Sequence, residues 1–128
     1  FNYGLGKNTE KVFFETNITN RGYSSKYANF KEGFKEEVEI RTFDEIFESM
    51  GISYNQAIII KIDAEGMEAE IIEGAMKSFS KIRKIFLIFE SHTGADKILR
   101  KLREITPYQL IELDSLNMGV IINNTNNV

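Results

Sequence analysis

The stretch from Ile58 to Gly74, IIIKIDAEGMEAEIIEG, constrains the fold more than any other part of the chain. A continuous apolar run leads into Asp63, a turn follows at Gly66, and apolar residues then return with helical spacing. This pattern predicts a parallel strand covered on both faces, followed by a crossover helix. Ligands of open α/β sheets bind just beyond the carboxyl ends of such strands. We therefore expect Asp63 and Glu65 to stand at a binding crevice.

Further strands and helices are predicted around this unit. Strands are expected at 11–15, 37–41, 57–62, 85–89, 108–113 and 118–122, and helices at 43–50, 67–79 and 95–105. The run IFLIF at 85–89 is a second strand of the type covered on both faces. Two such strands joined through a helix require a right-handed parallel crossover. The sequence thus predicts an α/β fold with parallel central strands, helices on both faces and an antiparallel hairpin at the C-terminal end.

Local signals give the expected limits of these elements. Thr42 and Glu45 form a capping box for the first helix, in which each residue would satisfy an amide of the other. Glu73 and Lys77 are spaced to pair across one turn of the second helix. The asparagine-rich tail at 123–128 is expected to fray.

Bulk properties restrict the class of protein. With 128 residues the chain forms one domain at most, which we expect to span 1–128. The net charge of −3 gives no electrostatic argument for a nucleic-acid partner, and the absence of cysteine excludes disulfides and thiolate metal sites. No apolar run approaches the roughly 20 residues that span a bilayer, so no membrane partner is expected. These properties are compatible with a cytoplasmic protein.

The central block also carries a family resemblance. KIDAEGMEAEIIEGA, at 61–75, resembles the signature of the FkbM-type S-adenosylmethionine-dependent methyltransferases. The residues that fit it are Lys61, Ile62, Asp63, Glu65, Gly66, Glu68, Gly74 and Ala75. Weaker matches flank the block, at 22–25 (GYSS), at 41–44 (RTFD) and at Glu90.

The resemblance implies a Rossmann-like methyltransferase sheet and S-adenosylmethionine as the cofactor. Methyltransferases of this fold begin with a strand, a glycine-rich turn and a helix that hold the cofactor. Gly4 and Gly6 lack the third glycine of such a turn, and no helical pattern begins there. We therefore interpret the chain as the C-terminal half to two-thirds of a methyltransferase domain, with the cofactor-binding residues expected upstream of Phe1.

Asp63 is the leading candidate for catalysis. A methyl transfer needs a group that accepts the proton of the attacking oxygen or nitrogen, and a carboxylate can do this directly or by holding a divalent metal. Glu65 would serve as a second base or metal ligand beside it. Both residues also have a structural interpretation, because acidic side chains stabilise the start of a helix, as Glu68 and Glu70 would.

Glu90 and His92 follow the second apolar strand. If the two strands are neighbours, these side chains would lie beside Asp63, and His92 would be a natural proton acceptor at neutral pH. A surface histidine in a loop explains His92 equally simply. The segment 22–34 would cover the acceptor, with Tyr23, Ser24 and Ser25 as candidate substrate-binding residues.

Three functions remain open at this stage. The first is part of an enzyme that transfers a methyl group to oxygen in a small molecule or glycan. The second is a truncated, non-catalytic remnant or interaction module that keeps the sheet. The third is a nucleic-acid methyltransferase, supported only by the basic residues of the helix at 95–105.

The placement of the 57–62 strand has a further consequence. In the family fold this strand lies beside the first, cofactor-bearing strand. Without that neighbour, an apolar strand becomes an open edge, which invites pairing with another chain. We therefore expect a homodimer through this strand, aggregation of the isolated chain, or a longer polypeptide.

Overall fold

The computed structural model describes residues 2–17, 24–25, 33–64, 66–90 and 94–124. Its elements in chain order are β1 (Gly4–Leu5), β2 (Glu10–Asn17), β3 (Ser24–Ser25), β4 (Gly33–Arg41), α1 (Phe43–Ser49), β5 (Ala57–Ile62), α2 (Glu68–Glu73), α3 (Met76–Phe79), β6 (Lys84–Glu90), α4 (Ala95–Ile105), β7 (Tyr108–Glu112) and β8 (Asn117–Asn123). They form two four-stranded sheets, sheet A with the order β1-β4-β2-β3 and sheet B with the order β5-β6-β8-β7.

Sheet B confirms the α/β class and corrects its details. β5 and β6 are parallel, as the crossover requires, and β7 and β8 form the expected antiparallel hairpin. However, β8 also pairs antiparallel with β6, so the sheet is mixed and its one parallel pair lies at an edge. The expectation of parallel central strands is therefore wrong for the described residues.

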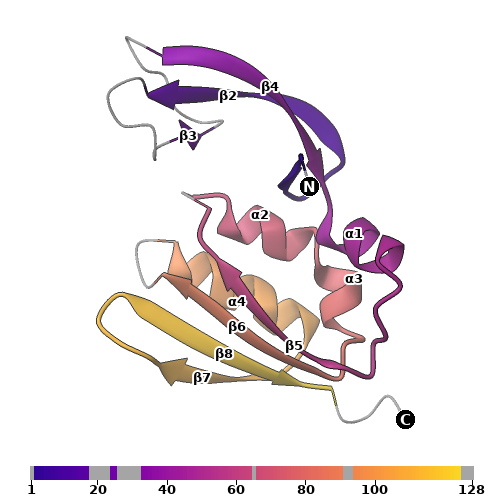
Figure 1. Ribbon diagram of the computed structural model, residues 1–128. Coiled ribbons are helices and arrows are strands. Elements are labelled where there is room, and N and C mark those ends of the chain that lie inside the picture. The colour runs from indigo at the N-terminus through magenta and orange to yellow at the C-terminus, as the bar shows by residue number, and fades with distance from the viewer. Residues whose placement is uncertain (1, 18–23, 26–32, 65, 91–93, 125–128) are drawn as a thin grey trace.

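The described helices cover one face of sheet B rather than two. Figure 1 shows α2, α3 and α4 on the same side of this sheet. Ile85, Leu87 and Phe89 point to that side and are fully buried, whereas Phe86 and Ile88 alternate with them and are only half-buried. In β5, Ile59 is 75% exposed. An unbroken apolar run does not reveal which face a helix will cover, so the prediction of two covered faces is wrong for the part of the chain that the structure describes.

The second predicted helix is divided in two. α2 ends at Glu73 and α3 begins at Met76, where the prediction had one helix over 67–79. Asp44 Oδ1 and Oδ2 accept hydrogen bonds from the backbone amides of Ser78 (2.7 Å) and Lys77 (3.1 Å), so α1 supplies the carboxylate that stabilises the first turn of α3. This long-range contact has no signature in the local sequence.

Side-chain pairing also differs from the expectation. The Thr42 hydroxyl accepts a hydrogen bond from the Glu45 amide at 3.2 Å, as a capping box predicts. The Glu45 carboxylate, however, accepts a hydrogen bond from the Thr9 hydroxyl. Lys77 pairs with Glu48 at 2.5 Å and not with Glu73.

Sheet A forms a projecting arm, which we define as β2, β3 and β4. β4 pairs antiparallel with the whole length of β2, from Glu10 beside Ile40 to Asn17 beside Gly33. In Figure 1 the arm extends from the helix layer toward the side on which β5 and β6 end.

One close backbone contact joins the arm to the helix layer. The turn at Gly6 lies so near the end of α2 that a Cβ on Gly74 would stand 2.0 Å from the Gly6 carbonyl oxygen. The Gly6 amide donates to Arg41 O and the Asp44 amide donates to Gly74 O, both at 3.0 Å. Only glycine at position 74 permits this approach without a shift of backbone.

Ion pairs reinforce the same junction. Glu73 accepts from Lys7, before β2, at 2.8 Å, and from Lys101, on α4, at 3.4 Å. The Glu73 side chain is 17% exposed, so both interactions are partly shielded from water. At the other end of the helix layer, Asn124 donates to the carbonyls of Phe79 and Ile82, both at 2.7 Å. The first two residues of the tail expected to fray, through Asn124, are therefore held by the fold. Residues 125–128 lie outside the described residues.

None of the described helices is long and apolar enough to cross a membrane.

Replacement of Gly74 by alanine should weaken the junction. The added Cβ would overlap a backbone carbonyl that cannot rotate away, so we expect a loss of about 3 kcal/mol in the free energy of unfolding. Gly51→Ala is the matched control: its φ of +64° is strained for alanine, but a Cβ there meets nothing within 4 Å, and we expect about 1 kcal/mol. Urea unfolding measures both. Equal losses of unfolding free energy in the two variants would contradict the close contact between Gly6 and Gly74.

Glu73 should make stability depend on acid pH. The hydrogen bond from Lys7, followed by the interactions with Lys101, lowers the pKa of the Glu73 carboxyl in the folded chain. Its contribution is therefore complete above the unfolded pKa of roughly 4.3 and is lost as the pH falls through the lower folded pKa. Glu73→Gln should cost about 1 kcal/mol at pH 7 and reduce the change in unfolding free energy between pH 7 and pH 3. Glu112→Gln, at an exposed position, should alter neither; a Glu73→Gln protein with the wild-type pH profile would refute the assignment.

Candidate active site

The carboxyl ends of β5 and β6 bring two acidic residues to one edge of sheet B. Ile62 lies beside Phe89 in the parallel register, so Asp63 and Glu90 continue the two strands at the same edge. Both residues are exposed. The structure therefore places two of the predicted catalytic residues on neighbouring strands at the position where α/β sheets bind ligands.

The Asp63 carboxylate faces solvent. Its side chain is 50% exposed, and Oδ2 lies 3.1 Å from the Lys61 ammonium. The amides of the turn that follows, at Ala64 and Gly66, donate to a different carboxylate, that of Glu68. Asp63 is thus not the residue that satisfies these amides, which leaves an accessible carboxylate for proton transfer.

Several acidic residues could have stabilised the start of α2, and in the structure Glu68 has this role. It is only 4% exposed, and its Oε1 accepts from the amides of Ala64 and Gly66, each at 3.2 Å. Gly66 has φ +95°, which permits the tight turn predicted there and directs both amides toward the first turn of α2. In the sequence, this contact is indicated by a glutamate two residues after the turn glycine, but the spacing does not show that the glutamate is buried.

The turn between β7 and β8 borders the same edge. Asn117 lies opposite Glu90 in the antiparallel register. Asp114 Oδ1 accepts from the amides of Leu116 (2.7 Å) and Asn117 (2.8 Å). These hydrogen bonds, the one from Leu116 foremost, lower the pKa of the Asp114 carboxyl. Asp114 therefore shapes the turn. The sequence predicted the hairpin but not that its turn lies near Asp63 and Glu90.

Some predicted site residues lie elsewhere or outside the described structure. Glu65, His92 and Tyr23 are not among the described residues. Ser24 and Ser25 form β3, which pairs with β2 at the edge of sheet A, so these residues belong to the arm and not to sheet B. Their substrate-binding role stays a prediction.

Metal binding finds no support among the residues that the structure describes. Within those ranges no three histidine, cysteine, aspartate or glutamate side chains group closely enough to hold an ion. The predicted pair of Asp63 and Glu65 includes one position outside them.

The basic helix is partly neutralised by acidic neighbours. On α4, Lys101 pairs with Glu73 and with Glu104, each at 3.4 Å. Arg103 donates to the Tyr108 hydroxyl at 3.2 Å. Lys101 and Arg103 therefore have partners within the fold, and this structural role weakens the argument for a nucleic-acid substrate.

The family described as methyltransferase FkbM domain matches residues 2–114, which span sheet A, the helix layer and most of sheet B. Neither the curated proteins nor the solved structures contain a match to this chain.

Removal of the Glu68 carboxylate should destabilise the turn beneath Asp63. Glu68→Ala leaves the amides of Ala64 and Gly66 without this acceptor, so we expect a loss of about 1–3 kcal/mol in the free energy of unfolding. Amide exchange at Gly66 should also accelerate. Glu36→Ala, at an exposed position of the arm, is the control and should change little. Wild-type stability and exchange in the Glu68→Ala protein would show that the carboxylate does not hold the turn.

Proposed function

Because this chain belongs to the FkbM methyltransferase family, we propose that it takes part in S-adenosylmethionine-dependent methyl transfer to a hydroxyl group of a small molecule or glycan. The observation that carries the proposal is the exposed Asp63 carboxylate, at the carboxyl end of β5 and beside the Glu90 position of β6. In sheets of this kind that edge is where substrates are bound.

The acidic edge suits the cofactor that the family uses. S-Adenosylmethionine supplies an electrophilic methyl group on a positively charged sulfonium. The two side chains that end β5 and β6 are carboxylates, which favour a nearby positive charge and accept hydrogen bonds from hydroxyl groups. Asp63 and Glu90 are therefore the residues of this chain that would border the cofactor's reactive end.

Asp63 acts as the general base in this proposal. The Asp63 carboxylate would accept the proton that the acceptor hydroxyl loses when its oxygen takes the methyl group that S-adenosylmethionine supplies. The Lys61 ammonium, 3.1 Å from Asp63 Oδ2, limits the orientations that the carboxylate can adopt. The buried Glu68 keeps the turn closed so that Asp63 remains directed away from the turn amides.

The arm supplies the acceptor side of the site. In Figure 1 the arm and the ends of β5 and β6 extend to the same side of the molecule. Ser24 and Ser25 in β3, with Tyr23 before them, would contribute hydroxyl groups for hydrogen bonds to a polar acceptor. This arrangement favours a hydroxylated acceptor such as a glycan over an apolar one.

Asp63→Asn should strongly slow methyl transfer without unfolding the protein. The amide keeps the shape of the carboxylate but cannot accept the proton, so we expect kcat to fall about 10²–10⁴-fold. The assay follows labelled methyl from S-adenosylmethionine onto a panel of hydroxylated small molecules and glycans, with the complete natural gene product that contains these residues. Glu104→Gln, an exposed carboxylate on α4, is the control and should keep wild-type activity.

Two outcomes would contradict the proposal. If the Asp63→Asn protein retains full activity, Asp63 is not the base. If the wild-type gene product neither binds S-adenosylmethionine in calorimetric titration nor transfers methyl, the fold serves as a non-catalytic interaction module instead.

A further inference from the structure

Three neighbouring strands of sheet B each bring one polar residue to the edge where β5 and β6 end. Asp63 and Glu90 continue β5 and β6 beside each other, and Asn117 of β8 lies opposite Glu90 in the antiparallel register. We call these three residues the polar row. Adjacent strands are spaced at about 4.8 Å, so Asp63 and Asn117, at its two ends, lie roughly 10 Å apart.

Strand alternation places Glu90 and Asn117 on the same face of sheet B. Side chains of directly opposed residues in an antiparallel pair project from the same face of the sheet. Phe89, which precedes Glu90, is fully buried beneath the helices. Glu90 and Asn117 therefore project from the other face, which the described helices leave uncovered.

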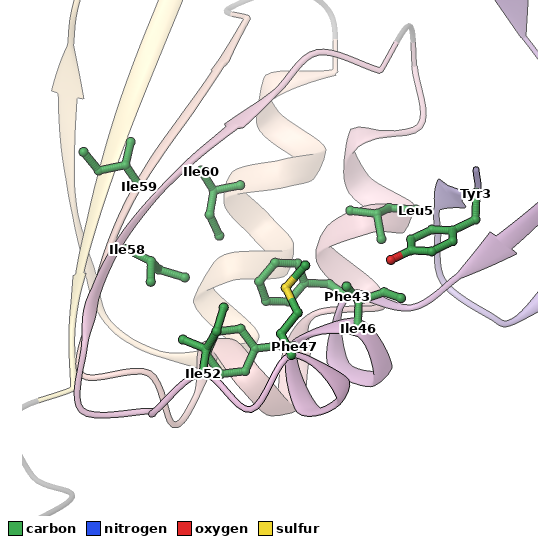
Figure 2. Close-up of a pocket in the computed structure, with 10 residues that line it drawn as sticks. Tyr3, Leu5, Phe43, Ile46, Phe47, Ile52, Ile58, Ile59 and Ile60 are labelled. Atoms are coloured by element: carbon green, nitrogen blue, oxygen red, sulfur yellow. The ribbon is translucent and has the colours of Figure 1, made fainter. Parts of the chain in front are cut away.

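Asp63 is held on the same face by Lys61. Figure 2 shows Ile60 of β5 directed toward the helices and Ile59 directed away from them. Lys61 alternates with Ile60, so its side chain lies on the uncovered face. The Lys61 ammonium is 3.1 Å from Asp63 Oδ2, and this ion pair keeps the Asp63 carboxylate on the face of the other members of the polar row.

Asn117 is held in one orientation by Asp114. Its Nδ2 group donates to both carboxylate oxygens of Asp114, each at 3.1 Å. Asp114 is itself fixed, because its Oδ1 accepts from the backbone amides of Leu116 and Asn117 at 2.7 and 2.8 Å. With its nitrogen engaged, the Asn117 side chain offers its oxygen as a hydrogen-bond acceptor. Because folding already fixes this orientation, a ligand would not have to order the side chain when it binds.

The charge around the polar row favours an uncharged ligand. Asp63 and Glu90 are carboxylates within the row, and the Asp114 carboxylate lies beside its third member. Lys61 pairs with Asp63. An anionic ligand would be repelled by these carboxylates, whereas hydroxyl groups can donate hydrogen bonds both to a carboxylate and to the Asn117 oxygen.

Building on the methyl transfer proposed above, on which this inference rests, we propose that Asn117 binds the methyl acceptor and determines which acceptors are used. The acceptor is an uncharged polyhydroxylated compound. The hydroxyl that is methylated lies at Asp63, and a second hydroxyl donates to Asn117 Oδ1. Two hydrogen bonds of about 2.8 Å each cover only about half of the span between these residues. The two hydroxyls are therefore several bonds apart in the acceptor, as they are on opposite sides of a sugar ring.

Acceptors that lack single hydroxyl groups test the proposal. With the complete natural gene product that contains these residues, the best acceptor of the panel used for Asp63 is compared with analogues that each lack one hydroxyl. In the wild type, an analogue that keeps the methylated hydroxyl but lacks the second one should lose about 3–10-fold in kcat/KM, as expected for one neutral hydrogen bond. In Asn117→Ala this difference between the two acceptors should disappear, because the second hydroxyl no longer has its partner.

Gln109→Ala is the matched control. Gln109 is an exposed side-chain amide on the same hairpin, but it lies near the start of β7, away from the polar row. The control should keep the wild-type preference among the acceptors. If Asn117 only holds the turn, its replacement should slow transfer to every acceptor by the same factor and leave the preference unchanged, which would overturn the proposal.

A binding measurement tests the contact independently of the rate. In two-dimensional NMR spectra of the isotope-labelled wild type, the side-chain amide signal of Asn117 should shift during titration with the best acceptor, and that of Gln109 should stay in place. An Asn117 signal that does not move, although the same acceptor is methylated, would overturn the proposal.

The outcomes separate this inference from the proposed function. A best acceptor that is anionic, or that has a single hydroxyl, overturns the role of Asn117 and leaves methyl transfer by this protein intact. A wild-type gene product that transfers methyl to no member of the panel overturns the proposed function, and the role of Asn117 with it.

Discussion

The backbone contact between Gly6 and Gly74 is the constraint on which the rest of this structure depends. The arm of β2, β3 and β4 is largely a two-stranded ribbon, and such ribbons are marginally stable in water unless they pack against something else. Here the ribbon is anchored where β1 and the end of β4 meet the end of α2. A side chain at position 74 would separate them. The arm keeps its orientation relative to sheet B because two glycine-containing turns touch without side chains between them.

A second set of backbone contacts shapes the carboxyl ends of β5 and β6, where Asp63 and Glu90 lie. Asp63 and Glu68 are both close enough in sequence to Gly66 to accept hydrogen bonds from the amides of the turn there. The structure assigns these amides to the buried Glu68 and leaves the half-exposed Asp63 beside Lys61. Glu68 is buried and held by the turn amides, whereas the Asp63 side chain is half-exposed at the end of β5. Of the two acids, Asp63 is therefore the one that is accessible from solvent, as the proposed function requires.

Regular patterns in the sequence predicted much of the framework. Apolar runs located β5 and β6, and their spacing around a helix correctly required that they be parallel. Thr42 marked the start of α1, and the two apolar runs at 108–113 and 118–122 predicted the closing hairpin of β7 and β8. Long-range partners escaped this reasoning. The division of 67–79 into two helices depends on Asp44, which lies more than 30 positions earlier and has no periodic relation to Ser78.

The sequence by itself determined the class of fold, the two parallel strands and the position of Asp63 at the end of the first, because these follow from local hydrophobic pattern and turn chemistry. It also carried the signature of the FkbM family, which the match over residues 2–114 supports. Only the tertiary structure decided that the described helices cover one face of sheet B, that β8 inserts between β6 and β7, and that Glu68 rather than Asp63 is buried. The physical reason is that burial and pairing are properties of neighbours distant in the chain. A run of isoleucines requires burial but does not specify which neighbour will provide it.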